Sequence, residues 1–500
     1  MSNLVYLLIL LLAISCTPKK DVLPNNKVII AGKITNQDPS IFNIRISINQ
    51  ISFGQKSFSP VLNDDGSFKI SFDSYVPTDV WLLYKMNFLI LTHPGDSIYV
   101  EFDGSPKDRT DILKTVRFGG YASKINEEAA TFQRIYYTTN FALNFEKRYQ
   151  VIKEYDAINY KRYMDSVRTE MKSLYQRFLK ENNASQEVQL WASTFLDVDY
   201  FRSLISYPDF HRTFNNLSRK DWDVPLSYYD FLTDHFQTNE SILISGYALA
   251  GFVNFYPVYL HVLMVDENRL FFSSTDTIKK YPEKLDSIEF FGTIKHVSDP
   301  LLRQMVLTEL LNEKLESSNI SMFEKYNSEV RNYITKQFLK DPLFKQYNIT
   351  KERLDKPIFT SESTLQKLRG TTVKSSIDSL IKANRGKVIY VDCWATWCGP
   401  CVSEIPNSIR LMKDYKNKNV AFVYICLDSE EKNWKSIISK NAIGGIHILL
   451  NKKQSIDFRE VFGIKGVPHY ILFNKNGNLS ENGTLPPMEI KEKLDKLLKQ

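Results

Sequence analysis

The sequence predicts a multidomain protein with an N-terminal antiparallel β-sandwich, a central α-helical domain and a C-terminal α/β domain. Alternating apolar and polar residues with tight-turn signals fill residues 27–117. Apolar residues three and four apart fill residues 118–350, and buried strands alternate with helices over residues 356–500. A chain of 500 residues is also too long for one ordinary domain, so several are expected.

The first residues predict export from the cytoplasm. Leu4–Ile14 is an apolar stretch of 11 residues, too short to span a bilayer comfortably, so residues 1–15 are interpreted as a cleaved signal peptide. The residues Leu-Ala-Ile-Ser-Cys at 12–16 resemble a bacterial lipobox, although the usual basic segment before it is missing. This resemblance implies a lipid on Cys16 and a polar tether over residues 16–26. An ordinary signal peptide or a single-span anchor is the alternative, and either also places the body outside the cytoplasm.

The segment 27–117 has the pattern of a small antiparallel sandwich. Residues 41–51 alternate apolar with polar, and the dipeptide Asp65-Gly66 signals a hairpin turn between strand-like runs. Residues 80–102 repeat the pattern around a Pro-Gly-Asp turn. The stretch Pro94–Val100 resembles the β domain that often precedes Bacteroidetes-type thioredoxin-like lipoproteins, and this resemblance supplies no chemistry.

The segment 118–350 is predicted to be helical. Residues 145–182 place apolar side chains three and four apart with charges on the other face, and packing within a bundle is favoured over a partner-binding face. Ser-Asp-Pro at 298–300 is a helix start. The apolar run 241–265 is interpreted as a buried helix pair, because Pro257 and His261 are awkward inside lipid.

The segment 356–500 carries the chemistry. Its strand 386–396 is apolar on both faces and ends just before Cys-Gly-Pro-Cys, after which a helix begins. A cysteine at a helix N-terminus ionises more readily, so Cys398 is the predicted nucleophile. Cys401, one turn later, can attack the mixed disulfide and release reduced product. Gly399 permits close approach of the substrate, and Pro400 fits a first helical turn because it needs no N–H donor.

Two carboxylates are candidates for the proton transfer that activates Cys401. Asp392 lies six residues before Cys398. A charged residue in a central strand costs free energy to bury, so a purely structural role is not favoured. Glu404 lies three residues after Cys401, about one helical turn further. The ordinary alternatives are a strand-end aspartate bound to backbone and a surface glutamate in a first helical turn.

The motif also carries a family resemblance. Trp-Cys-Gly-Pro-Cys resembles thioredoxin, and the residues 397–406 resemble the TlpA/ResA group of membrane-anchored thioredoxin-like proteins. The resemblance implies a thioredoxin-like fold for residues 356–500. It also implies that the aspartate at Asp392 or the glutamate at Glu404 deprotonates Cys401; this chain has both, so the dominant base stays open.

The same resemblance implies a substrate-binding surface. The family has a cis-proline facing the dithiol, where this chain has Val467 and Pro468, and its local backbone pairs with extended substrate. Together with Trp397, Gly399 and Pro400, these residues are the expected substrate contacts. His469 stands where the family often has threonine, so it is a candidate for tuning this surface.

The remaining cysteines and the histidines suggest no second centre. Cys393 and Cys426 each lie in an apolar strand, and two buried packing residues are favoured over a second redox pair. A single Cys-x-x-Cys is also half of a zinc site, but no second such pair or His-x-x-x-His completes it, so no metal is expected.

The sequence therefore predicts a thiol-disulfide oxidoreductase of the cell envelope, anchored by Cys16 to the outer or inner membrane and facing the periplasm. It would reduce protein disulfides, receive electrons from an upstream thiol reductant, and use no cofactor beyond the redox-active Cys398–Cys401 pair. A disulfide oxidase or isomerase is the alternative within this class; a partner- or glycan-binding lipoprotein with an accessory thioredoxin-like domain is the alternative outside it. Peroxide reduction is disfavoured. The net charge of +7 is mild, and no dense basic run predicts nucleic acid as a partner.

Overall fold

The computed structural model describes most of the chain as two compact units. The described residues are 26–41, 44–232, 238–366, 368 and 372–500. The predicted signal peptide, the lipidated Cys16 and the tether as far as residue 25 lie outside the described residues. The first unit contains three segments: the chain up to Ser47, then Ser57–Thr139, and finally Asn182–Gln189. The second unit contains Ile48–Lys56, Asn140–Glu181 and Leu190–Gln500.

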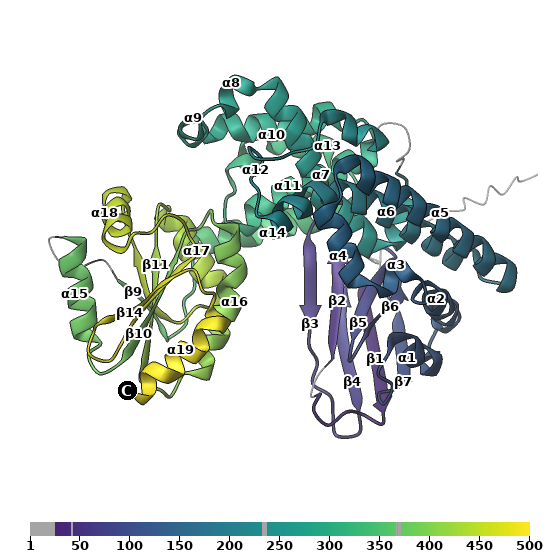
Figure 1. Cartoon of the computed structure of the whole chain (residues 1–500), viewed down its shortest axis with the longest axis horizontal. Helices are drawn as coiled ribbons and strands as arrows, with labels where there is room; N and C mark the ends of the chain where they lie inside the picture. Colours follow the sequence, from purple (N-terminus) through teal and green to yellow (C-terminus); the bar gives the residue numbers. More distant parts are fainter. Residues whose placement is uncertain (1–25, 42–43, 233–237, 367, 369–371) are drawn as a thin grey trace, which may run out of the picture. The chain divides into compact units, whose positions relative to one another are not determined.

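The N-terminal part is rich in β-structure, as predicted. Two four-stranded sheets have the orders β4-β1-β7-β8 and β3-β2-β5-β6 (Figure 1). One pairing differs from the expected antiparallel pattern, because β1 runs parallel to β7; the long chain between these two strands makes that direction possible. Face-to-face packing of the two sheets stays a prediction. The strands are β1 (Lys27–Thr35), β2 (Arg45–Gln50), β3 (Gly54–Phe58), β4 (Ser67–Asp73), β5 (Thr78–Leu83), β6 (Asn87–Thr92), β7 (Ser97–Asp103) and β8 (Arg117–Gly119).

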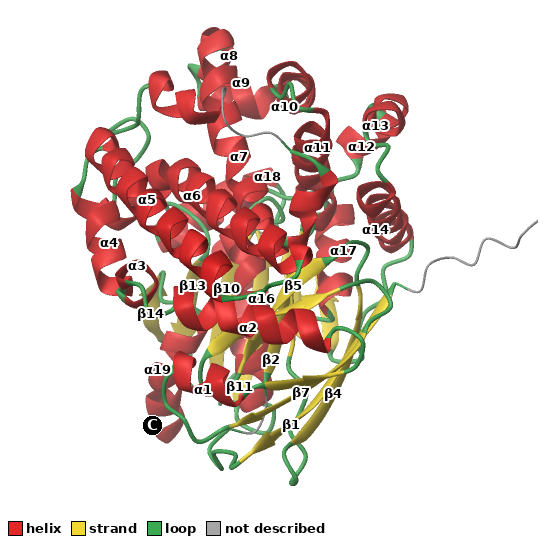
Figure 2. Ribbon diagram, turned by 90° about the vertical axis from the view of Figure 1, so that its right-hand side faces the viewer, coloured by secondary structure: helices red, strands yellow, loops and turns green. Residues whose placement is uncertain are grey.

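The edge strand β6 is covered by helix α2 (Ser123–Tyr136), which lies across the strands in Figure 2. Asn126 donates to the carbonyl of Leu91 at 3.0 Å and accepts from its N–H at 2.7 Å. Gln133 makes the same pair of bonds with Leu89, at 2.9 and 2.7 Å. Two side-chain amides therefore satisfy backbone groups that an edge strand would otherwise leave exposed.

The central part is helical, as predicted. The periodic stretch 145–182 forms two helices. Asp299 caps the predicted helix start by accepting from the N–H groups of residues 301 and 302. Its elements, with the short helix α1 before them, are α1 (Arg109–Thr115), α3 (Asn140–Leu143), α4 (Phe145–Glu154), α5 (Ala157–Glu181), α6 (Gln186–Asn215), η1 (Leu226–Leu232), η2 (Glu240–Ile244), α7 (Gly246–Glu267), α8 (Arg269–Phe272), α9 (Thr275–Lys280), α10 (Pro282–His296), α11 (Pro300–Glu316), α12 (Ser321–Lys325), α13 (Asn327–Tyr333) and α14 (Gln337–Asp355).

The predicted helix pair over residues 241–265 is wrong. The stretch forms the short turn η2 and a single helix, α7, which continues through Pro257. Within the described residues, α7 is the helix whose length and mean hydropathy of 1.6 would suffice to cross a membrane. It packs against α10 and α11, and 44% of its most apolar window is buried.

The C-terminal part is an α/β domain built on one six-stranded sheet, as predicted. The strand order is β14-β13-β10-β11-β12-β9, so β10 is a central strand. It pairs in parallel with β11 and antiparallel with β13. The elements are β9 (Ser363–Gln366), α15 (Val373–Ala383), β10 (Val388–Trp394), α16 (Gly399–Asp414), β11 (Val420–Cys426), α17 (Glu431–Asn441), β12 (Gly445–Leu449), α18 (Lys452–Phe462), β13 (His469–Phe473), β14 (Leu479–Gly483) and α19 (Pro487–Lys499).

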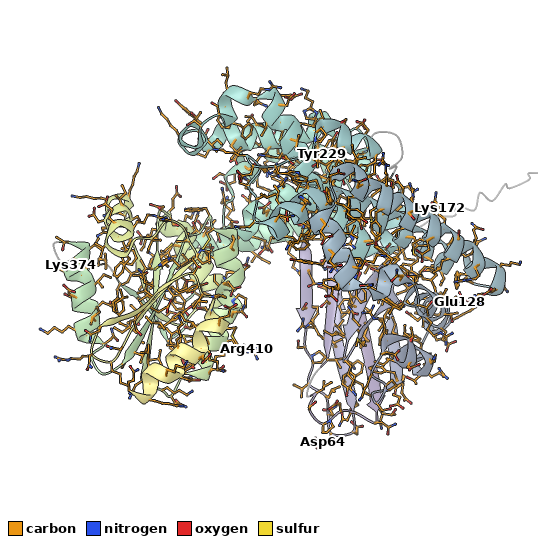
Figure 3. All side chains as sticks on the ribbon, in the orientation of Figure 1. Asp64, Glu128, Lys172, Tyr229, Lys374 and Arg410 are labelled. Atoms are coloured by element: carbon orange, nitrogen blue, oxygen red, sulfur yellow. A yellow bond between two sulfur atoms is a disulfide. The ribbon has the colours of Figure 1, made fainter. Side chains whose placement is uncertain are left out.

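Helices cover both faces of this sheet. One buried apolar cluster joins the strands to α16, α17 and α19, and a second joins them to α15 and α18. Accordingly, Lys374 of α15 and Arg410 of α16 lie on opposite sides of the sheet in Figure 3. Strand β10 is buried along its whole length because its alternate side chains enter the two clusters. The segment that follows β10 therefore begins at the carboxyl end of a central, buried strand.

Candidate active site

The dithiol lies where β10 ends and α16 begins. Cys398 is the N-cap of α16, and its Sγ accepts a hydrogen bond from the backbone N–H of Cys401 at 3.2 Å. The two cysteines form a disulfide, and each side chain is 4% exposed. Pro400 lies in the first turn, where its missing N–H leaves no acceptor unsatisfied. Once the pair is reduced, the helix N-terminus favours a negative charge on Cys398.

The surroundings of Cys398 are open to a substrate. Trp397 is 60% exposed, and its indole N–H donates to the carbonyl of Asp428 at 2.9 Å. A Cβ atom on Gly399 would meet no atom within 4 Å, so this face of the motif is unobstructed. On the other side, the carbonyl oxygen of Val467 lies 3.6 Å from Cys398 Sγ, and the peptide bond between Val467 and Pro468 is cis. The structure therefore brings the five predicted substrate contacts around one sulfur atom.

Asp392 lies inside the domain, close under α16. Its carboxylate is 7% exposed, and Oδ2 accepts from the hydroxyls of Ser408 at 3.1 Å and Tyr390 at 3.4 Å. The Ser408 hydroxyl also lies 3.3 Å from that of Tyr424, the residue paired with Asp392 on β11. Burial raises the pKa of Asp392 to about 7, while the bonds from Ser408 and Tyr390 oppose the rise. The group can therefore gain or lose a proton near neutral pH.

Glu404 lies on the exposed side of α16 and is half-buried. Its Oε2 accepts from the side-chain amide of Asn407 at 3.0 Å. Its negative charge is close enough to contribute to the raised pKa of Asp392. The two carboxylates predicted from the sequence thus belong to one electrostatic site.

The family of this domain follows from its sequence and the fold around the dithiol. Residues 386–479 match the protein family described as Thioredoxin-like, a span that contains both cysteines and the cis-proline. The C-terminal domain is thioredoxin-like.

The thioredoxin-like domain has thiol-disulfide oxidoreductases among its relatives at low identity. Thiol-disulfide oxidoreductase ResA from Bacillus thuringiensis (strain Al Hakam) is 27% identical over 120 residues, which cover 24% of this chain and 66% of that protein, just under two thirds. Thioredoxin-like protein YneN from Bacillus subtilis (strain 168) is 28% identical over 124 residues, covering 23% of this chain and 69% of that protein. The solved thioredoxin domain of a thiol-disulfide oxidoreductase from Bacteroides vulgatus is 25% identical and covers 23% of this chain and 83% of that one, with a TM-score of 0.22.

The other two cysteines of the thioredoxin-like domain cannot pair with each other. Cys393 and Cys426 are free and fully buried. Cys393 belongs to the cluster with α15 and α18, and Cys426 to the cluster with α16, α17 and α19, so they lie on opposite faces of the sheet. The interpretation as packing residues is confirmed, and the alternative of a second redox pair is excluded.

Sequence reasoning missed the hydroxyl groups around Asp392. Ser408 lies seven residues after Cys401 on the same buried face of α16, and a lone polar residue at that spacing was the available signal. Tyr390 lies two residues before Asp392 on the same strand face. Tyr424 could be found only from the pairing of β10 with β11, which the sequence does not give. His469, the candidate for tuning the surface, is buried with Nε2 2.6 Å from Asn482 Oδ1.

Proposed function

We propose that this protein reduces disulfide bonds of polypeptide substrates through the Cys398–Cys401 pair. The observation that carries the proposal is the placement of this disulfide at the start of α16. The exposed Trp397 lies next to it in the chain, and the buried carboxylate under α16, Asp392, has a pKa of about 7. Thiol-disulfide oxidoreductases among the relatives support the same chemistry.

The reaction begins with the reduced pair. The Cys398 thiolate attacks one sulfur of the substrate disulfide, forms a mixed disulfide and releases the other sulfur as a thiolate. Cys401 then loses its proton towards the carboxylate pair of Asp392 and Glu404, and its thiolate attacks the sulfur of Cys398. This step releases the second substrate thiol and leaves the Cys398–Cys401 disulfide. Two electrons pass to the substrate, and an upstream thiol reductant restores the dithiol.

We place this activity in the cell envelope, with a lipid on Cys16 and attachment to the outer or inner membrane facing the periplasm. The support is the apolar leader and the lipobox-like residues at 12–16. Labelling cells with radioactive palmitate tests the anchor: the wild-type chain should incorporate label, and a Cys16→Ser chain should not. An unlabelled wild-type chain would refute the lipid anchor and leave the redox activity untouched.

The activity is tested by reduction of insulin with the full-length protein. Replacing Cys398 with Ser should abolish it, whereas Cys401→Ser should accumulate a mixed disulfide with the substrate, because the resolving thiol is gone. Cys393→Ala is the matched control, since it removes a buried thiol outside the dithiol. A wild-type protein that cycles no disulfide at all would overturn the proposal.

The direction of electron flow is tested by the reduction potential of the Cys398–Cys401 pair. A value near that of thioredoxin, about −270 mV, supports reduction of substrates. A value near that of DsbA, about −120 mV, would instead support a disulfide oxidase.

A further inference from the structure

A pocket of about 220 Å³ lies in the helical part of the chain, far in sequence from the dithiol. Its lining comes from helices α3, α4, α5 and α6. Aromatic rings dominate this lining: Phe141, Phe145, Tyr149, Tyr160, Tyr163 and Phe210. An apolar cavity of about 150 Å³ binds a benzene ring, so this pocket has room for one ring and a small polar group.

Arg148 of α4 brings a positive charge into this lining. Its guanidinium carbon lies 5.2 Å from the ring centre of Phe141 and 5.4 Å from that of Phe145, two of the lining rings. Burial raises the pKa of Tyr163 on α5, and the Arg148 charge opposes this rise, so the guanidinium lies near a third lining ring as well. Within the part of the chain that the structure describes, Arg148 Nε has no hydrogen-bond acceptor and the guanidinium forms no salt bridge. The charge is therefore placed among the rings without a protein partner.

The other charges around the pocket leave that of Arg148 uncompensated. Arg202, the second arginine in the lining, is neutralised by Asp199, whose Oδ1 accepts from the Arg202 Nε at 3.0 Å. Among the described residues that line the pocket, none is an aspartate or a glutamate. An aromatic cage also suits a quaternary ammonium ion, but the charge of Arg148 repels a cation. A carboxylate matches the planar guanidinium, which can donate two parallel hydrogen bonds to it.

We propose that this pocket binds a small aromatic monocarboxylate, whose ring packs among the aromatic side chains and whose carboxylate accepts hydrogen bonds from the Arg148 guanidinium. Removing the ring from water supplies affinity, and the offset or edge-on packing of aromatic rings orients it. The carboxylate gives the half-buried Arg148 the partner that it otherwise lacks. The inference goes beyond the proposed disulfide reduction, because it assigns a ligand site to helices for which the sequence favoured packing alone.

The test compares two probes that share a ring and differ in charge. The full-length protein is titrated by calorimetry with 3-phenylpropionate and with its neutral amide, 3-phenylpropionamide. The carboxylate should bind about ten- to a hundredfold more tightly, because its hydrogen bonds to the guanidinium are charge-assisted. Arg148→Gln removes the charge, so the two probes should then bind equally. Arg162→Gln is the matched control, because it removes an exposed arginine of α5 outside the lining; its preference for the carboxylate should stay unchanged.

Several outcomes of the titration would overturn the pocket proposal. Equal affinity of the wild type for the two probes, or no binding of either, would do so. A preference for the carboxylate that persists in Arg148→Gln would also do so, as would tighter binding of benzyltrimethylammonium, a cation with the same ring. A wild-type protein that prefers the carboxylate but reduces no insulin would overturn the proposed function and leave the pocket proposal intact.

A second measurement keeps the proposal testable if the Arg148→Gln protein does not fold. Met164 lines the pocket, so its methyl signal can be followed by NMR in the wild-type protein carrying carbon-13 in its methionine methyl groups. A bound 3-phenylpropionate ring should shift this signal, which the Met164→Leu variant identifies. The signal of Met171, on the same helix but outside the lining, should stay in place. A Met164 signal that does not move when the probe saturates the protein would refute binding in this pocket.

Discussion

Replacing Asp392 with Asn should make the protein more stable, and increasingly so as the pH rises. In the folded chain the pKa of Asp392 is about 7, against an ordinary value of 3.8. The folded state therefore holds this proton more tightly than the unfolded state, so its stabilising contribution is complete below about pH 4 and is lost as the pH rises to 7. A difference of about 3 pKa units at 1.36 kcal/mol each gives about 4 kcal/mol lost above pH 7. Asn keeps an acceptor for Ser408 and Tyr390 and carries no charge.

The assay is urea unfolding of the wild type and the Asp392→Asn protein at pH 5 and pH 8. From pH 5 to pH 8, the difference in free energy of unfolding should change by about 3 kcal/mol in favour of Asn. Comparing two otherwise identical chains cancels the other titrating groups, including buried His447, whose lowered pKa of about 4 costs stability as the pH falls. A difference that is the same at both pH values would refute the reasoning, because it would mean that ionising Asp392 inside the fold costs nothing.

Three further substitutions test the site and the fold. Ser408→Ala removes a hydrogen bond that lowers the pKa of Asp392, so carbon-13 NMR of the carboxyl should show that pKa raised by up to about one unit. Glu404→Gln removes a charge that raises the same pKa, so the titration should shift to lower pH; a shift of the same sign in both variants would contradict this picture. In the N-terminal β-rich part, Gly66→Ala should cost about 1–3 kcal/mol more in urea unfolding than Gly54→Ala. Both glycines have positive φ, but only at Gly66 would the new Cβ meet a backbone oxygen, at 2.1 Å; equal losses would contradict it.

The dithiol could be placed from the sequence because its signals are local. A continuous apolar run predicts a buried strand, and a cysteine followed by Gly-Pro predicts a helix start at Cys398. The sequence also predicts a functional role for Asp392, because a carboxylate buried in such a strand is energetically costly. These predictions depend only on residues that are close together in the chain, so they require no knowledge of how the strands pair.

What escaped prediction depends on residues far apart in the chain. The contact of Ser408 with Asp392 and Tyr424 needs the packing of α16 on the sheet and the register of β10 with β11. The single helix α7 differs from the predicted helix pair for another reason. Pro257 normally interrupts a helix, yet α7 continues through it because tertiary packing outweighs local propensity.

Asp392 and Glu404 are not independent candidates for the proton acceptor. Burial raises the pKa of Asp392 to about 7, and the charge of Glu404 adds to that rise, so the charge on Glu404 alters the affinity of Asp392 for a proton. A pH profile of disulfide reduction therefore reports the protonation of Asp392 in the presence of the Glu404 charge. Removing Glu404 leaves Asp392 more often ionised at neutral pH but a weaker base towards Cys401. A loss of activity in either single variant therefore includes the effect of that substitution on the other carboxylate. Only the double variant shows how much proton transfer the two carboxylates provide together.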